Sequence, residues 1–367
     1  MKPQTSAADG NNTNNLASIK TYCKAKEQST GSATVDGLYI APSQFYATWR
    51  DVAPGGTASN VSGAAAEAAI AAAAGTGSLW TSRNAASAKS WTAVAYGDGL
   101  YVAVASNSVM TSTDEITWTS RTSSSNSSWQ GVVYGNGTWV AVSYDGKVMT
   151  STDGFNWTSR TSAVAASRNW YSVTYGNAFF VAVGKDGTGG NSIMTSPDGV
   201  TWTSQTSPTS TSPYYWWNSV AYGNNLFVAV AFTGGARTTH IMTSPDAITW
   251  TLQTHSGADF QSVAYGNGLW VATGYTAAYT SPDGVTWTIR ADFADHQWVS
   301  VVYGRDTWVA VSSSGTQRVM TSPDGITWSL QTSAGETKPW VAVTYGGGKL
   351  VAVAGSLSSE VGLVMTG

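Results

Sequence analysis

The stretch Met194 to Thr203, MTSPDGVTWT, occurs six times along the chain with small changes. The other copies are MTSTDEITWT from Met110, MTSTDGFNWT from Met149, MTSPDAITWT from Met242, YTSPDGVTWT from Tyr279 and MTSPDGITWS from Met320. The copies recur at roughly 40 residues, a period typical of repeat architectures. We therefore interpret the chain as an array of one repeated unit.

The segment Ser196 to Trp202, called the box below, predicts a hairpin. The residues Ser-Pro-Asp-Gly suit a type I turn followed by a left-handed position for glycine. A second strand is expected to leave at once through Val200, Trp202 and Ser204. The aspartates expected to accept hydrogen bonds from their own turns are Asp114, Asp153, Asp198, Asp246, Asp283 and Asp324. Glu115 and Ala247 replace the glycine in two copies, so these two turns should be a little strained or differently built.

A second repeated phrase precedes each box. It reads WTAVAYGDGLYVAV from Trp91, and it recurs from Trp129, Trp170, Trp217, Phe260, Trp298 and Trp340. The pattern indicates two strands joined by a Gly/Asn turn, and both faces of each strand carry apolar or small residues. Such strands must be covered on both faces. Strands A and B of the first phrase and C and D of the second thus predict one four-stranded blade of a β-propeller.

Counting the phrases predicts how the ring closes. There are seven A–B phrases and six complete C–D phrases, because the last unit stops at Gly367 after strand C. The segment 79–83, LWTSR, matches a strand D and has no strand C before it. We expect this segment to pair with the last strand C. The predicted fold is all-β: a seven-bladed β-propeller over residues 79–367, closed by an N-terminal outer strand.

The amino-acid composition limits the classes of partner that we expect. Charged residues are 11% and the net charge is −3 with 18 Lys and Arg, so we expect no nucleic-acid partner. No apolar run approaches the ~20 residues of a membrane span, so we expect no membrane insertion. Cys23 is the single cysteine, which excludes an internal disulfide framework. The first fifteen residues hold no hydrophobic segment, so we expect no secretory signal and exit by another route, such as inside an assembled particle.

Residues 1–78 do not follow the repeat and form a separate N-terminal arm. The stretch 61–74, VSGAAAEAAIAAAA, predicts a short alanine-rich helix that ends at the following Gly-Thr-Gly. Two interpretations stay open. The arm is either a disordered segment or N-terminal cap, or an element that docks the propeller onto a larger assembly, with homo-oligomer formation as an option.

Loop lengths point to one face of the ring. The A–B and C–D turns keep one length, whereas the interval from the first Val of VAV to the next box Met is eight residues after Val102, thirteen after Val181 and fourteen after Val228. The D–A interval also varies. In an up-and-down blade both variable loops emerge on the same rim, which makes that rim the candidate binding surface.

The richest part of this rim is expected over blades 3 to 5. The candidate ligand-binding residues are Tyr214, Tyr215, Trp216, Phe232 and Arg237. Exposed aromatic rings with small polar neighbours suit sugar rings, whose apolar faces stack on them. In the alternative interpretation, these aromatic side chains cover the base of their own loop.

The sequence predicts neither a catalytic centre nor a metal or cofactor site. Residues that could suggest one on the variable face are His240, His255, His296, Asp259, Asp292, Asp295, Glu336 and Glu360. The histidines lack a ligand spacing of a known kind, and the two glutamates both fall in blade 7. A glycosidase would need two facing carboxylates, and no nucleophile motif or phosphate-binding loop is present.

The box S-P-D-G-x-T-W, seen at 196–202, 281–287 and 322–328, resembles a shortened Asp-box or BNR repeat of sialidase-type propellers. The resemblance covers the ring and not residues 1–78. It implies a structural turn at the blade periphery, with activity supplied by an arginine triad, a Tyr/Glu pair and an acidic Asp. Arg83, Arg121, Arg160 and Arg290 share one repeat position with Gln205, Gln253 and Gln331, so sialidase activity is not expected.

The low charge and the Gly/Ser/Thr-rich repeats behind a non-repeating arm are also similar to propellers of bacteriophage tail and other virion proteins. This resemblance implies a non-enzymatic virion protein, a tail-fibre or receptor-binding component that binds a host-surface glycan or protein, with residues 1–78 contacting other virion proteins. One alternative is a capsid or collar decoration protein with a purely structural ring. Another is a carbohydrate-active enzyme with an unrecognised site.

Overall fold

The computed structural model describes residues 33–35, 38–41, 44–45, 80–163, 168–185, 192–208, 215–232, 238–256, 260–293, 295–334, 338–355 and 363–367. The chain divides into two compact units, Met1–Thr76 and Gly77–Gly367. In the first unit β1 (Ala33–Val35), β2 (Leu38–Ala41) and β3 (Gln44–Phe45) form an antiparallel sheet in that order. The alanine-rich helix predicted over 61–74 lies outside the described residues.

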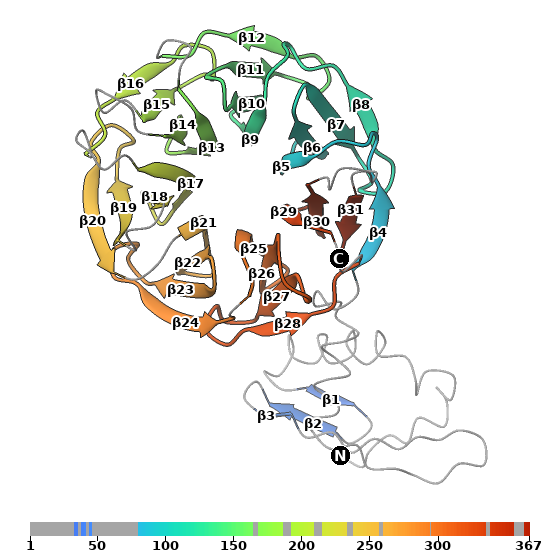
Figure 1. Ribbon diagram of the computed structural model, residues 1–367. Coiled ribbons are helices and arrows are strands. Elements are labelled where there is room, and N and C mark those ends of the chain that lie inside the picture. Colours follow the sequence, from blue (N-terminus) through green and yellow to red (C-terminus); the bar gives the residue numbers. More distant parts are fainter. Residues whose placement is uncertain are drawn as a thin grey trace. The chain divides into compact units, whose positions relative to one another are not determined.

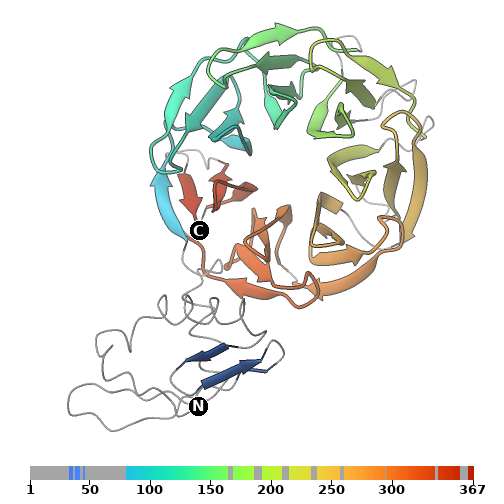
Figure 2. The ribbon, with the colours of Figure 1, turned by 180° about the vertical axis from the view of Figure 1, so that it is seen from behind.

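The second unit is a ring of seven four-stranded antiparallel sheets, each with strand A innermost and strand D outermost (Figure 1). Figure 2 shows the same closed ring from behind. The predicted all-β seven-bladed propeller is therefore confirmed. Within the described residues, no helix is long and apolar enough to cross a membrane.

The strands of blades 1 to 4 follow the chain in order. Blade 1 contains β5 (Trp91–Gly97), β6 (Leu100–Ala105), β7 (Ser108–Ser112) and β8 (Thr119–Arg121). Blade 2 contains β9 (Trp129–Gly135), β10 (Thr138–Ser143), β11 (Val148–Ser151) and β12 (Thr158–Arg160). Blade 3 contains β13 (Trp170–Gly176), β14 (Phe179–Gly184), β15 (Ile193–Ser196) and β16 (Thr203–Gln205). Blade 4 contains β17 (Trp216–Gly223), β18 (Leu226–Phe232), β19 (Thr238–Ser244) and β20 (Thr251–Ser256).

The last three blades complete the ring. Blade 5 contains β21 (Phe260–Gly266), β22 (Leu269–Gly274), β23 (Ala277–Ser281) and β24 (Thr288–Asp292). Blade 6 contains β25 (Trp298–Gly304), β26 (Thr307–Ser312), β27 (Val319–Ser322) and β28 (Ser329–Gln331). Blade 7 contains β29 (Trp340–Gly346), β30 (Lys349–Ala354), β31 (Leu363–Thr366) and, from the other end of the ring's sequence, β4 (Thr81–Asn84).

The ring closes as the repeat count predicts. Strand β4 pairs antiparallel with β31, with Thr81 opposite Thr366 and Arg83 opposite Val364 (Figure 1). Without β4, strand β31 would present an unpaired edge. Pairing the two ends of the repeat array leaves blade 7 with the same four strands as the others.

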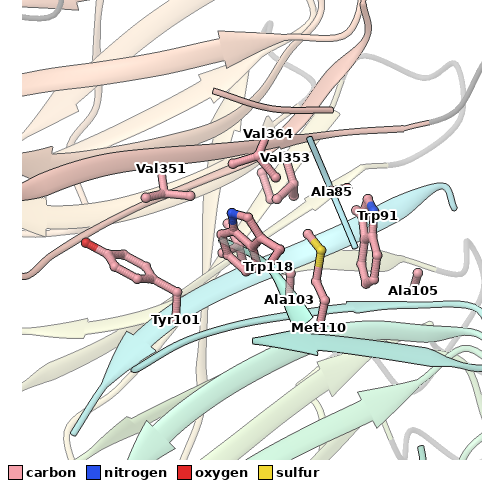
Figure 3. Close-up of a cluster of buried hydrophobic side chains, with 12 residues drawn as sticks. Ala85, Trp91, Tyr101, Ala103, Ala105, Met110, Trp118, Val351, Val353 and Val364 are labelled. Carbon is pink, nitrogen blue, oxygen red and sulfur yellow. The ribbon is translucent and has the colours of Figure 1, made fainter. Parts of the chain in front are cut away.

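The core lies between blades. Seven clusters of buried side chains each fill the space between two adjacent sheets. Figure 3 shows the cluster at the closure, where Val351 and Val364 of blade 7 face Trp91 and Met110 of blade 1. The sheets are apolar on both faces because each face meets a neighbouring blade.

Glycine and tyrosine at the end of strand A interlock around the whole ring. A Cβ built on Gly97 would lie 2.3 Å from the Tyr134 side chain of the next blade, and the same clash recurs at each strand A glycine. The last such glycine, Gly346, accommodates Tyr96 of blade 1. The absence of a side chain at these seven positions therefore lets each blade approach the next.

All seven A–B turns are two-residue turns in which both residues have positive φ, the type I′ pattern. Asn136 and Gly137, at φ 46° and 73°, show the usual residues. Asn177 and Ala178 in blade 3 show that a Cβ is tolerated at the second position. These turns explain why the A–B length does not vary.

The box differs from the predicted hairpin in one respect. Asp198 accepts hydrogen bonds from the backbone N–H groups of Val200 and Thr201, at 2.8 and 2.9 Å, so the fastening role predicted for this carboxylate is confirmed. The prediction that strand D begins at Val200 is wrong, because those N–H groups point at the carboxylate. Strand β16 begins only at Thr203, after the Trp202 indole N–H donates to the Gly199 carbonyl.

The strained turns are confirmed in the two copies without glycine. Glu115 and Ala247 have φ of 56° and 66°, in the region that glycine occupies at no steric cost. The carboxylates of Asp114 and Asp246 still accept the two backbone N–H bonds in these copies. The box therefore forms in all six blades that contain it.

The antiparallel order separates the loops into two rims. The fixed rim carries the A–B turns and the box loops between strands C and D. The variable rim carries the B–C and D–A loops, whose lengths differ between blades. The two rims are opposite ends of the same strands.

Candidate functional site

Two of the predicted ligand-binding residues form an open contact on the variable rim. Trp216 begins β17, is 38% exposed, and has its ring centroid 5.6 Å from that of Phe232 at the end of β18. Tyr215 is 7% exposed and packs against Trp217 in the core, so it is not available to a ligand. Tyr214 and Arg237 lie outside the described residues.

The contact continues onto both neighbouring blades. Tyr275, which follows β22 of blade 5 and is 38% exposed, lies 5.6 Å from Phe232 between ring centroids. On the other side, the Lys185 Nζ lies 5.1 Å from the centroid of the Trp216 ring. Lys185 also forms a backbone bridge with Trp216 that joins blade 3 to blade 4. One cation and three rings thus lie side by side across three blades.

A tyrosine pair extends this surface to blade 2. Tyr144, which follows β10 and is 48% exposed, meets the ring of Tyr171 edge-on at 5.9 Å. Asn169 connects the pair to Lys185, because its Nδ2 donates to the Tyr144 carbonyl and its own carbonyl accepts from the Lys185 N–H. Burial, and then the neighbouring Tyr144, raise the pKa of Tyr171 to about 12, so the Tyr171 hydroxyl is neutral near pH 7.

We call this surface the aromatic row. It comprises Tyr144, Tyr171, Lys185, Trp216, Phe232 and Tyr275.

One repeat position supplies most of the row. Tyr144, Lys185, Phe232 and Tyr275 each follow the sixth residue of strand B in blades 2 to 5. The same position in the other three blades holds Ser106, Ser313 and Gly355. Alignment of the repeats would have revealed this contrast. Sequence reasoning that ranked the loops by length found Trp216 and Phe232 but missed the rest.

The aromatic row suits ligands with flat apolar faces. Tyrosine and tryptophan offer large rigid rings with polar edges, and a lysine beside them offers a hydrogen-bond donor. Sugar rings combine apolar faces with hydroxyl groups at their edges. A surface of separated rings along a rim can therefore contact successive units of a chain-like glycan.

Of the residues that had suggested a metal or acid–base site, the structure describes the side chains of three, His296, Asp292 and Asp295. His296 is buried and stacks on Trp298 with an interplanar angle of 4°. Asp292 and Asp295 are exposed. Among the residues that the structure describes, no group of three or more His, Cys, Asp or Glu side chains could hold a metal ion. Residues 259, 336 and 360, and the side chains of His240 and His255, lie outside the description.

Three of the four repeated arginines, Arg121, Arg160 and Arg290, have a structural partner on strand C. The Nε of Arg121 donates to Thr111 Oγ1 at 3.0 Å, and that of Arg160 donates to Thr150 Oγ1 at 2.8 Å. Gln205 makes the equivalent bond to Thr195 at 2.8 Å. Arginine and glutamine at this position thus make the same hydrogen bond, which links strand D to strand C.

Solved structures share this architecture. A streptogramin B lyase is 9% identical over 79% of this chain and 97% of that chain, with a TM-score of 0.65. YCF48 bound to a D1 peptide is 12% identical over 78% and 94%, with a TM-score of 0.59. The Cps50 (Swd1) β-propeller domain of Myceliophteria thermophila is 8% identical over 79% and 99%, with a TM-score of 0.56.

These likenesses define the class of protein as a seven-bladed β-propeller. They show the fold alone at such identities. No family model and no curated protein sequence matches the chain.

Proposed function

We propose that the chain is a non-enzymatic binding protein of a virion, a bacteriophage tail-fibre or receptor-binding component that holds a host-surface glycan on its variable rim. The observation that carries the proposal is the aromatic row, which spans blades 2 to 5. The phage assignment and the location in an extracellular particle come from the sequence resemblance. The glycan comes from the chemistry of the row.

The row is not needed to build a blade. If its rings served only to cover the base of their own loops, every blade would need a large side chain at the position after strand B. Blades 1, 6 and 7 have Ser106, Ser313 and Gly355 there and still form the same four strands. The large side chains of blades 2 to 5 therefore favour a role in contacting something outside the ring.

A binding role without catalysis is also part of the proposal. The box carboxylates accept hydrogen bonds within their own turns, and Arg121, Arg160 and Arg290 donate to strand C. A glycosidase needs two carboxyl groups facing one bond. Near the row, the described part of the variable rim offers a ligand no such pair of carboxylates. Asp145 lies there, and its Oδ2 forms an ion pair with the Lys147 Nζ at 3.2 Å.

Incubation with a panel of purified neutral and acidic bacterial polysaccharides tests the proposal. We expect one of them to be retained by the intact protein without any change in chain length. Shortening of the polysaccharide would favour the alternative of a carbohydrate-active enzyme. Neither retention nor shortening, with no attachment to cells, would favour a purely structural ring.

The variant Trp216→Ala/Tyr275→Ala ties the result to the row. Both side chains are exposed, so the thermal midpoint should not change, while polysaccharide retention should fall at least tenfold. The matched control is Ile248→Ser/Ile326→Ser, which removes equally exposed apolar side chains from the fixed rim. Equal retention by the two variants would contradict a binding site on the row.

A further inference from the structure

The fixed rim is a second surface with a regular chemistry. All seven A–B turns and all six box loops lie within the described residues, so its composition can be stated in full for these loops. It differs from the variable rim in having loops of constant length. Whatever it contacts would therefore meet the same arrangement in blade after blade.

Each box turns one large apolar side chain to the solvent. The six residues occupy a single repeat position and are 38–51% exposed: Ile116, Phe155, Val200, Ile248, Val285 and Ile326. They are six of the ten large hydrophobic residues exposed in the described part of the chain. Isolated exposed apolar residues are normal on any protein. The same class of residue at one position in six blades is a pattern, and we call it the apolar collar.

The box aspartate fixes the direction of each collar residue. The backbone N–H of Val200 donates to Asp198 Oδ1 at 2.8 Å, and the N–H of Ile326 donates to Asp324 Oδ1 at 2.8 Å. The equivalent bonds in the other four boxes are 2.8–3.0 Å long. A preorganised side chain loses less conformational entropy on binding than a mobile one.

The loops of the fixed rim are strongly acidic. They carry nine carboxylates: Asp98, Asp114, Glu115, Asp153, Asp198, Asp246, Asp283, Asp306 and Asp324. The cations beside them are Arg305 in a turn, Lys349 at the start of β30 and Arg121 of β8. Hydrogen bonds from backbone N–H groups lower the pKa of the six box aspartates, so each of these aspartates stays ionised at neutral pH. Apolar and acidic groups therefore alternate around this rim.

One contact within the molecule shows the chemistry that fits such a surface. The guanidinium carbon of Arg121 on strand β8 lies 4.4 Å from the centroid of the collar residue Phe155 in the next blade. A cation beside a collar residue is attracted by the aromatic face of Phe155 here, and by the adjacent carboxylates in every box.

The two ends of the ring's sequence also lie on this rim. Gly367 donates its N–H to the carbonyl of Leu350, next to the A–B turn of blade 7, and packs against Trp80. Trp80 leads directly into β4. Trp80 and Gly367 therefore both lie at the rim that bears the collar.

We infer that the apolar collar and the carboxylates around it are a docking surface for a protein partner whose own face presents lysine or arginine together with apolar side chains. Charge complementarity excludes a second copy meeting this rim face to face, because two acidic rims repel each other. The inference does not rest on glycan binding, which uses the opposite rim.

The test uses the intact chain and three immobilised peptides of equal length that alternate lysine with leucine, lysine with serine, or glutamate with leucine. We expect saturable binding of the lysine–leucine peptide only. The variant Ile248→Ser/Val285→Ser/Ile326→Ser should weaken this binding at least tenfold. The variant Asp98→Asn/Asp306→Asn, which places at each turn position a residue found there in other blades, should weaken it and reduce its dependence on salt.

Trp216→Ala/Tyr275→Ala is the matched control on the variable rim, and it should bind the lysine–leucine peptide as the wild type does. Unchanged binding by the collar variant would overturn the inference. So would tighter binding of the glutamate–leucine peptide. If the wild-type chain forms a dimer in sedimentation equilibrium and the collar variant does not, the occupant of the collar is a second copy of this chain. That result would also overturn the inference of a different protein partner.

Discussion

The strand A glycines show how a single absent Cβ organises the ring. At Gly223, a Cβ would lie 2.3 Å from ring atoms of Tyr265 in the next blade, a distance that no native contact shows. Seven such contacts follow one another around the ring and return to blade 1. The hydrophobic pattern predicts the strands, but this spacing between them depends on backbone positions that a sequence does not contain.

We expect Gly223→Ala to destabilise the ring by about 1–3 kcal/mol, the usual range for overpacking. The control is Gly355→Ala, since Gly355 is not in the left-handed region, no atom lies closer than 3.3 Å to a Cβ built there, and Ser106 and Ser313 hold the same repeat position. Urea denaturation of the two variants measures the difference. Equal midpoints would contradict the interlock.

At the glycine position of the box, a substitution to glycine should stabilise the chain. Glu115 has φ 56° where four other boxes have glycine, and a left-handed residue with a side chain costs about 1–2 kcal/mol. Glu115→Gly should therefore stabilise the chain by about 0.5–1 kcal/mol after the extra entropy of glycine in the unfolded state. The reverse change, Gly154→Ala, should destabilise, because its Cβ would lie 2.5 Å from Leu100 Cδ2. A destabilising Glu115→Gly would show that strain is not the governing factor.

At the scale of the element, the box is a loop fastened by one carboxylate and not a simple reversal between two strands. Sequence reasoning predicted the role of Asp198 but started strand D too early. Val200 and Thr201 have strand-like side chains, yet their N–H groups are committed to Asp198 and are not available to strand C. That competition between a side chain and a neighbouring strand becomes visible only in the hydrogen bonds.

The six boxes should make stability depend on pH in acid. Backbone N–H bonds, mainly from Thr117, hold the pKa of Asp114 at about 2, and the same cause lowers the pKa of the other box aspartates. Because the unfolded state binds protons more readily, this stabilisation is complete above about pH 4 and is lost as the pH falls toward 2.

Urea midpoints measured between pH 5 and pH 2.5 check this dependence. The variant Asp198→Asn should lose less stability over that interval than the wild type, because one of the six carboxylates no longer titrates. Asp292→Asn, an exposed carboxylate outside any box, should follow the wild-type curve. Parallel curves for the wild type and Asp198→Asn would rule out the box as the source of the pH dependence.

At the scale of the whole molecule, the closure between β4 and β31 makes the ring one cooperative unit. A chain lacking residues 1–84 would leave β31 with an unpaired edge and, without Trp80, uncover the cluster that contains Leu350, Ala352 and Met365. We expect this truncation to lower the thermal midpoint and to associate in a concentration-dependent way, whereas a chain lacking residues 1–76 should keep the wild-type midpoint. Calorimetry with light scattering distinguishes the two, and equal midpoints would contradict closure by β4.

The ring could be predicted from repeat counting, because its closure follows from the number of phrases at each end. The candidate site could be predicted only in part. Trp216 and Phe232 flank long loops and could be selected by loop length, whereas Tyr144 and Tyr275 begin short loops. Their contacts with Tyr171 and Phe232 cross from one blade to the next, and sequence order keeps those residues far apart.

We propose that the variable rim of the ring binds the ligand and that the fixed rim attaches the protein to the particle. An image of the protein in its assembled particle, at a resolution that separates the blades, tests this assignment most directly. It should show the aromatic row of blades 2 to 5 facing outward and the rim with Trp80 and Gly367 facing the particle. A ring seated in the opposite sense, with its boxes outward and its variable loops buried in the particle, would contradict it.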